Sequence, residues 1–226
     1  MTRIAFLHTG AVVIPPVTER ARAVLPDATV VNYLDDRIVA DLGDAELAAS
    51  VADRLAHLAE AARDAGADVL MLTCSSISGY AAQTAARAGI PVLRIDEAMA
   101  DQAVHIGARI AVIATLPTTL TPTVALLRER AALTGVEPII VEEVVDGAFA
   151  AVSGGDRPLH DRLVASAIER LAAGADVVVL AQASMASAAE RVRVDVPVLT
   201  SIEPGIARLG ELIAARAATT TEGDLR

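Results

Sequence analysis

The sequence predicts an α/β protein with two pseudo-symmetric lobes, each a four-stranded parallel sheet flanked by helices, and a functional site in the cleft between the lobes. Two observations lead to this prediction: short Val/Ile/Leu runs alternate with longer Ala-rich helical patterns, and the whole pattern occurs twice. Strands that are apolar almost throughout are typical of parallel sheets, because helices cover both faces of such a sheet.

The apolar runs define the expected strands. They lie at residues 3–8, 28–34, 67–73, 91–95, 109–115, 137–143, 176–181 and 197–202. The clearest helical pattern lies at residues 45–66, where apolar residues recur at spacings of three and four and Gly66 ends the pattern. Helical segments between the runs supply the crossovers that parallel strands require.

An internal repeat predicts the division into lobes. AGADVLMLTCSS at residues 65–76 aligns without a gap on AGADVVVLAQAS at 173–184, and RIAFLHT at 3–9 aligns on RIAVIAT at 109–115. PVL also occurs after each central pattern. We expect the first lobe at residues 1–97, completed by 201–226, and the second at 98–200, so the chain crosses between the lobes twice.

Composition excludes several classes of function. The chain has 226 residues, of which 29 are acidic and 19 are Lys or Arg, and a formal charge of -10 disfavours nucleic acid as a partner. The start, MTRIAFLHTG, lacks the features of a secretory signal, and no apolar run reaches the roughly 18 residues of a membrane span. We therefore expect a cytoplasmic protein with no membrane association. Aromatic residues are only 2%, which favours a small polar ligand, and the Ala-rich helices allow a homodimer.

Ligands of open α/β sheets bind beyond the carboxyl ends of the strands, and two facing sheets can line one site with both sets of strand ends. The candidate site residues at or after these ends are His8, Thr9, Cys74, Ser75, Ser76, Thr115, Thr118, Thr119, Gln182 and Ser184. Hydroxyls and backbone N–H groups at helix starts can hold a carboxylate. The sequence therefore predicts a small carboxylate substrate.

Cys74 is the only cysteine, and it lies between an apolar run and a helix expected to begin near Ser76. The positive end of a helix favours thiolate over thiol, which would make Cys74 a nucleophile or base. The alternative is a small buried hydrophobic residue. Its place at a repeat-defined strand end favours the catalytic interpretation.

His8 lies at the carboxyl edge of the same predicted sheet as Cys74. Its imidazole could increase the thiolate character of Cys74 or transfer a proton, or it could simply line the site. The other histidines, His57, His105 and His160, are expected to be structural or exposed to solvent.

A group of carboxylates also follows or ends the strands: Asp35, Asp36, Asp96, Glu97, Glu142, Glu143 and Glu203. Helix capping is the favoured interpretation of these acids. If two of them faced inward, they would bind an ammonium group or a divalent cation. No set of His, Cys, Asp and Glu has metal-ligand spacing, and no phosphate-binding loop motif occurs, so we expect neither a metal nor a cofactor.

The duplicated layout, together with LTCSSISG at 72–79, IATLPTTLTPTV at 113–124 and VVVLAQASMA at 177–186, resembles the aspartate/glutamate racemase superfamily. That superfamily includes hydantoin racemases, maleate isomerase and arylmalonate decarboxylase. The resemblance implies a cofactor-independent enzyme with one cysteine from each half on either side of a carbon next to a carboxylate. One thiolate removes the proton, and the other thiol returns a proton from the opposite face.

The chain departs from this pattern at Gln182, which occupies the place of the second cysteine. An amide cannot work as a general base or acid near neutral pH, which disfavours racemisation by two thiols. The sequence therefore predicts a racemase-like isomerase that uses Cys74 as thiolate base or nucleophile beside a carboxylate. Two alternatives remain: a single-thiol decarboxylase, and a protein that binds small acids without catalysis.

Overall fold

Two four-stranded parallel sheets form the centre of the computed structural model, which describes residues 1–223 and side chains as far as residue 216. The first sheet has the order β2-β1-β3-β4 and the second β6-β5-β7-β8. The strands are β1 Arg3–His8, β2 Thr29–Leu34, β3 Val69–Leu72, β4 Val92–Arg94, β5 Arg109–Ala114, β6 Ile139–Val144, β7 Val177–Leu180 and β8 Val198–Leu199. The predicted fold class, with two helix-flanked parallel sheets, is confirmed.

Helices connect the strands in the alternating order that the sequence predicts. The α-helices are α1 Ile14–Val24, α2 Ile38–Asp41, α3 Ala45–Asp64, α4 Ala81–Ala88, α5 Glu97–Ile106, α6 Pro117–Thr134, α7 Ala148–Ser153, α8 Arg157–Ala172, α9 Ala186–Ala189 and α10 Ile202–Gly223. Three short 3-10 helices follow strands or a turn: η1 Ala11–Val13, η2 Ser75–Tyr80 and η3 Ala183–Met185.

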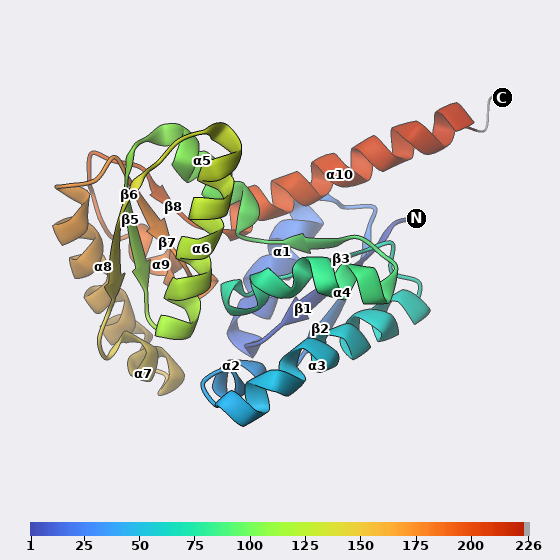
Figure 1. Cartoon of the computed structure of the whole chain (residues 1–226), viewed down its shortest axis with the longest axis horizontal. Coiled ribbons are helices and arrows are strands. Elements are labelled where there is room, and N and C mark those ends of the chain that lie inside the picture. Colours follow the sequence, from blue (N-terminus) through green and yellow to red (C-terminus); the bar gives the residue numbers. More distant parts are fainter. Residues whose placement is uncertain (224–226) are drawn as a thin grey trace.

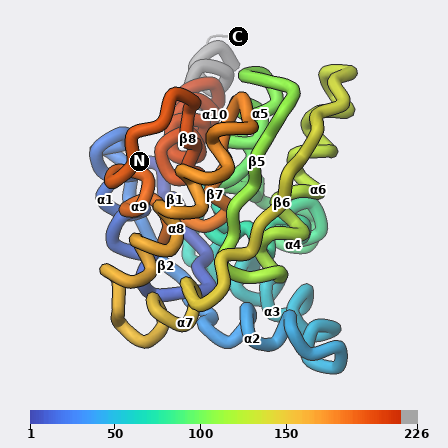
Figure 2. Tube along the Cα trace, turned by 90° about the vertical axis from the view of Figure 1, so that its left-hand side faces the viewer, coloured from blue at the N-terminus to red at the C-terminus, as the bar shows by residue number. Residues whose placement is uncertain are grey.

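The two sheets share strand order and pairing pattern. In the first sheet Ala5 of β1 pairs with Leu70 of β3, and in the second Ala111 of β5 pairs with Val178 of β7. Figure 2 shows the second sheet from its outer side, with β6 at one edge and β8 towards the other. The internal repeat is therefore a repeat of strand pairing as well as of sequence.

Each sheet is covered on both faces, as its nearly continuous apolar strands require. In β1, Ala5 and Leu7 pack with α3 and α4, whereas Ile4 and Phe6 pack with α1 and α10. In the second sheet, one face packs with α5 and α6 and the other with α7, α8 and α9. These side chains of β1 are 0% exposed, so the alternation places all four in a core.

Two helices pack on the sheet of the other half of the repeat, and not on the sheet whose last strand they follow. Helix α5 follows β4 of the first sheet, but its Met99 and Ala103 lie in the core of the second. Helix α10 follows β8 of the second sheet, and its Ile206 and Leu209 lie in the core of the first. Figure 1 shows α10 leaving the second lobe and lying along α1 of the first. The predicted lobe boundaries at residues 97 and 200 remain a prediction, and residues 224–226 lie outside the described part of the chain.

The helix expected near Ser76 begins at Ser75, but its first six residues are the 3-10 helix η2, and the α-helix α4 begins at Ala81. Three serine side chains of η2 are bound elsewhere: Ser75 to Ala181, Ser76 to Thr119 and Ser78 to Asp96. Serine side chains that bind outside the helix favour such local departures from α-helical geometry.

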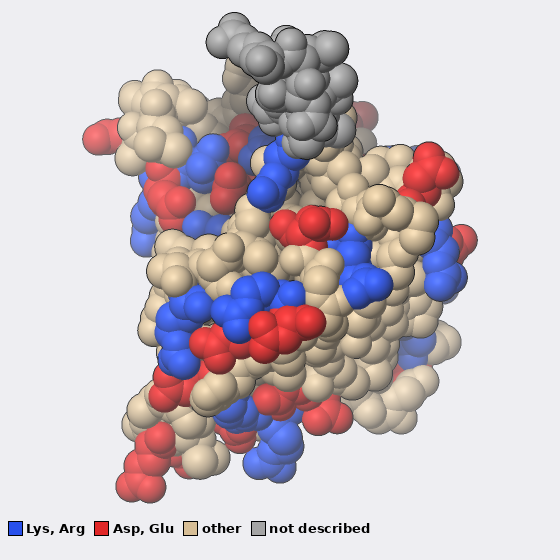
Figure 3. Space-filling model, turned by 90° about the vertical axis from the view of Figure 1, so that its right-hand side faces the viewer, with Lys and Arg blue, Asp and Glu red and all other residues tan. Residues whose placement is uncertain are grey.

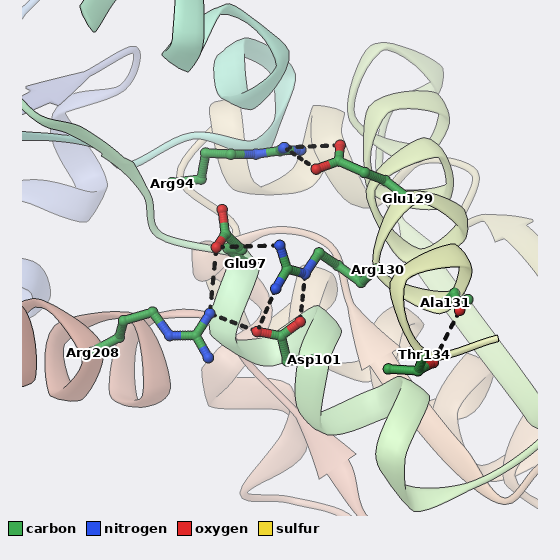
Figure 4. Close-up of polar contacts among 8 residues, drawn as sticks. All are labelled: Arg94, Glu97, Asp101, Glu129, Arg130, Ala131, Thr134 and Arg208. Carbon is green, nitrogen blue, oxygen red and sulfur yellow. Dashed lines mark hydrogen bonds and ion pairs between the residues drawn. The ribbon is translucent and has the colours of Figure 1, made fainter. Parts of the chain in front are cut away.

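Ion pairs connect the lobes on one side of the molecule (Figure 4). Arg94 of β4 contacts Glu129 of α6 at 3.1 Å, and Arg208 of α10 contacts Asp101 of α5 at 2.6 Å. Arg130 of α6 contacts the same Asp101 carboxylate at 2.5 Å. Burial would raise the pKa of Asp101, but hydrogen bonds from the two guanidinium groups outweigh burial and lower it. The Asp101 carboxylate is therefore ionised at neutral pH.

Acidic and basic side chains lie next to each other on the face shown in Figure 3, rather than in patches of one sign. Within residues 1–223, no helix is long and apolar enough to cross a membrane.

Candidate functional site

Cys74 and Gln182 occupy equivalent positions in the two lobes. Each is the residue between a central strand and a 3-10 helix: Cys74 has φ -128° and ψ 127°, and Gln182 has φ -127° and ψ 136°. Both side chains are half-buried. The backbone thus repeats where the side-chain chemistry does not, since one position carries a thiol and the other an amide.

The two strand ends meet across the lobe boundary. The Ser75 hydroxyl, next to Cys74, donates to the carbonyl of Ala181, next to Gln182, at 2.9 Å. The contact joins residues only one position from the repeat-equivalent pair. The sequence prediction that repeat-equivalent strand ends face each other agrees with this contact.

A second contact joins the lobes beside the first. The Ser76 and Thr119 hydroxyls lie 3.0 Å apart, with Thr119 in the first turn of α6. Ser75, Ser76 and Thr119 are all buried. These three predicted ligand-binding hydroxyls therefore hold the lobes together in this structure, and a carboxylate would have to replace one of these contacts to bind them directly.

Thr115 binds Gln182 within the second lobe. Its backbone N–H donates to Gln182 Oε1 at 2.6 Å, and its hydroxyl donates to the same oxygen at 2.9 Å. Of the remaining predicted residues, Thr9 is buried after β1, Thr118 is half-buried in α6, and the carbonyl of Ser184 accepts from Arg157. The structure thus joins Thr115 directly to Gln182 and gives Ser184 a backbone role.

His8 is fully buried and both of its ring nitrogens have protein partners. Nε2 lies 2.9 Å from Asn32 Oδ1, and Nδ1 lies 2.8 Å from the Thr73 hydroxyl. Because Asn32 Oδ1 can only accept, Nε2 carries the proton, and Nδ1 of the neutral ring shares the single Thr73 hydroxyl hydrogen with the Leu7 carbonyl, which lies 3.1 Å from that hydroxyl. Burial lowers the pKa of His8, and the hydrogen bond to Asn32 opposes this effect only in part. His8 therefore holds Thr73, the residue before Cys74, and its catalytic role stays a prediction.

The buried His8 predicts a pH dependence of stability. Below pH ~6.5 the unfolded chain takes up a proton that the folded protein resists. We therefore expect the free energy of unfolding to fall as the pH falls from 7 to 5, and His8→Gln to reduce this slope. The measurement is urea unfolding at several pH values. His57→Gln, which removes an imidazole from an exposed site on α3, is the control; equal slopes in both variants would contradict the prediction.

The geometry matches a known family. The family model described as "Asp/Glu/Hydantoin racemase" matches residues 7–209, most of the chain. The chain belongs to this family. No curated protein matches the sequence.

Solved structures show the same fold as this racemase-family chain. Glutamate racemase from Francisella tularensis, solved with D-glutamate, is 14% identical, with a TM-score of 0.78 over 96% of this chain and 82% of that one. Allantoin racemase from Klebsiella pneumoniae is 21% identical, with a TM-score of 0.66 over 95% and 89%. Arylmalonate decarboxylase is 18% identical, with a TM-score of 0.56 over 92% of each chain.

In this family member, the predicted acidic group is mostly bound to arginines. The ion pairs are Asp35 with Arg54, Glu97 with Arg130 and Arg208, Glu142 with Arg128, Glu143 with Arg170, and Glu203 with Arg20. Asp36 is exposed, and the fully buried Asp96 accepts from Ser78 at 2.6 Å. Five of the seven carboxylates are thus paired with arginines, and among the described residues the seven do not form a common metal site.

Sequence reasoning missed a polar cluster around the buried Asp161 in the second lobe. Asp161 of α8 accepts from His160 at 2.9 Å and from Ser187 of α9 at 2.8 Å, and Arg191 lies 3.2 Å from its other oxygen. Burial would raise the pKa of Asp161, but these partners outweigh it and lower it. The cluster fixes α9 on α8. A sequence signal was absent because these residues lie on two separate helices.

The described residues offer no metal centre to the racemase-family site. Within residues 1–223, no three or more His, Cys, Asp and Glu side chains come close enough together to hold a metal ion. The chemistry available at the lobe boundary is therefore that of a thiol, an amide and several hydroxyls.

Proposed function

We propose that this protein is a racemase-like isomerase that acts, without a cofactor, at a carbon next to a carboxylate of a small acid. Cys74 is the thiolate base or nucleophile. The observation that supports this most strongly is the pairing of equivalent strand ends, in which Cys74 lies one residue from a contact that joins it to the Gln182 junction. Family membership and the similarity to racemases of known structure support the same class of reaction.

The Cys74 thiolate removes the proton next to the carboxylate, and the C–H electron pair moves onto the carboxylate to give an enediolate. Return of the proton from the Cys74 thiol restores the original configuration, so inversion requires that solvent water protonate the opposite face and that the thiol lose its proton to solvent. His8 positions this group through Thr73. A related route is addition of the thiolate to an activated double bond, which allows rotation about the bond before the thiol leaves.

Decarboxylation is the second candidate, because a single thiol can also protonate the carbanion that remains after loss of carbon dioxide. The fold shared with arylmalonate decarboxylase favours keeping this candidate. A protein that only binds small acids is the remaining alternative.

The test combines two measurements on the wild-type protein with malonate, maleate, mandelate and aspartate. The first is protection of Cys74 from iodoacetamide, and the second is incorporation of solvent deuterium by NMR, with carbon dioxide release measured in parallel. Protection with deuterium incorporation or double-bond isomerisation supports the isomerase. Carbon dioxide release supports the lyase, protection alone supports a binding protein, and absence of protection by every acid contradicts the proposal.

A further inference from the structure

Thr115 fixes the orientation of the Gln182 side-chain amide. Both of its donors, the backbone N–H at 2.6 Å and the hydroxyl at 2.9 Å, point to one atom of that amide. A backbone N–H can only donate, so the atom that it contacts must be the carbonyl oxygen Oε1. The two hydrogens of Nε2 are therefore directed away from Thr115. Among residues 1–223, no hydrogen-bond partner is recorded for Nε2.

This oriented amide belongs to the strand end that contacts the Cys74 strand end. Gln182 has nearly the same backbone angles as Cys74, and the Ser75 to Ala181 hydrogen bond brings the two junctions together. A small ligand that bound between the two junctions would lie beside Cys74 of one and Gln182 of the other. The amide is half-buried, so a hydrogen bond from it is only partly weakened by competition with water.

We propose that Gln182 is an oxyanion donor, held in position by Thr115, that binds a carboxylate or carbonyl oxygen of the substrate opposite Cys74. This inference rests on the proposed function. When Cys74 removes the proton, negative charge develops on the substrate oxygens, and a fixed N–H donor stabilises that charge without transferring its own proton. Gln182, which occupies the place expected for a second acid-base group, thus stabilises the negative charge on the substrate oxygens.

A stereochemical consequence follows. Because the amide cannot deliver a proton to the opposite face, the proton returns from Cys74 to the face it left. Deuterium incorporation should therefore proceed faster than inversion of a chiral acid. Mandelate tests this directly, because exchange at its carbon is measured by NMR and inversion by chiral chromatography.

The variants separate the donor role from simple charge and from structural effects. Gln182→Glu keeps an acceptor for Thr115 but replaces the donor by an anionic oxygen, and Gln182→Met removes the donor without adding charge. We expect both to weaken binding of malonate by about tenfold or more, the usual effect of losing a hydrogen bond to a charged group. Deuterium exchange should fall by roughly 100-fold, as for other oxyanion donors. Gln102→Glu, at an exposed site on α5, is the charge-matched control.

Thr115 is a positioning residue, and its variants give an independent readout. Thr115→Val removes one of the two donors that orient the amide, whereas Thr115→Ser retains both. We expect the valine variant to bind malonate more weakly and the serine variant to bind it as the wild type does. Thermal unfolding of each variant reports whether the fold is kept.

The outcomes distinguish the two proposals. Weaker malonate binding in both Gln182 variants, with no exchange in any protein, would support the donor and contradict the proposed catalysis. Exchange by the wild type with unchanged binding in Gln182→Met would contradict the donor and leave the proposed function standing. Weaker malonate binding in Gln182→Glu but not in Gln182→Met would show that charge repulsion causes the effect, and it would contradict the donor role. Failure of the wild type to bind any of malonate, maleate, mandelate and aspartate would overturn both.

Discussion

Replacing Cys74 with alanine is expected to lower the rate of deuterium incorporation by a factor of about 100 or more. Cys74 is the only cysteine in the sequence, and no other thiol can replace it as base. A positioned general base or acid typically contributes roughly 10²- to 10⁴-fold to the rate. The measurement is the initial exchange rate of the acid that protects Cys74 from alkylation.

Folding should be nearly unchanged in this variant, because the Cys74 side chain is half-buried at the edge of its core. Ser50→Ala, at an exposed site on α3, is the matched control for a single polar truncation. Cys74→Ser tests whether the group must ionise, since a hydroxyl is a much weaker base at neutral pH. Retention of more than half of the exchange rate in Cys74→Ala would contradict the assignment.

Gly205→Ala is expected to destabilise the protein by roughly 1–3 kcal/mol, the usual cost of overpacking a well-packed site. In most helices this change gains about 0.5–1 kcal/mol, so the expected sign is opposite to the helix-propensity effect. The reason is that an added Cβ would lie 2.3 Å from the carbonyl oxygen of Ile95, and a backbone atom cannot move aside as a side chain can. Urea unfolding measures the change.

Gly210→Ala is the matched control in the same helix. Its added Cβ would lie 3.3 Å from Val24 Cγ1, a methyl group that can move by a few tenths of an ångström. The cost there should be clearly smaller than at Gly205. Equal effects at the two positions, or stabilisation by Gly205→Ala, would show that the contact with Ile95 is not tight.

The sheets could be predicted from the sequence because each strand is marked by its own run of consecutive apolar residues. The run at residues 3–8 matches β1, since every residue after Arg3 is buried there. The run at 197–202 gave a strand of only two residues, Val198–Leu199, because Ile202 already belongs to α10. An apolar residue at the end of a strand and one at the start of the next helix look alike in sequence.

The site could be predicted only as a set of strand ends. Cys74 and Gln182 were assigned from the repeat, which encodes their equivalence. The partners of His8 were not predictable in this way, because Asn32 and Thr73 lie on or after different strands and meet it only through sheet register. The same holds for the Ser75 contact with Ala181, which depends on how two separately encoded lobes pack.

The exchange of α5 and α10 has a consequence for motion. Each sheet is completed by a helix that enters from the other half of the repeat, so two chain segments pass between the lobes close to Ile95 and Gly205. Because neither of these two chain connections can lengthen, we expect the lobes to separate by rotation about the line through the two connections. A separation of the lobes at the strand ends would break the Ser75 and Ser76 contacts, while the two chain connections near Ile95 and Gly205 would stay in place.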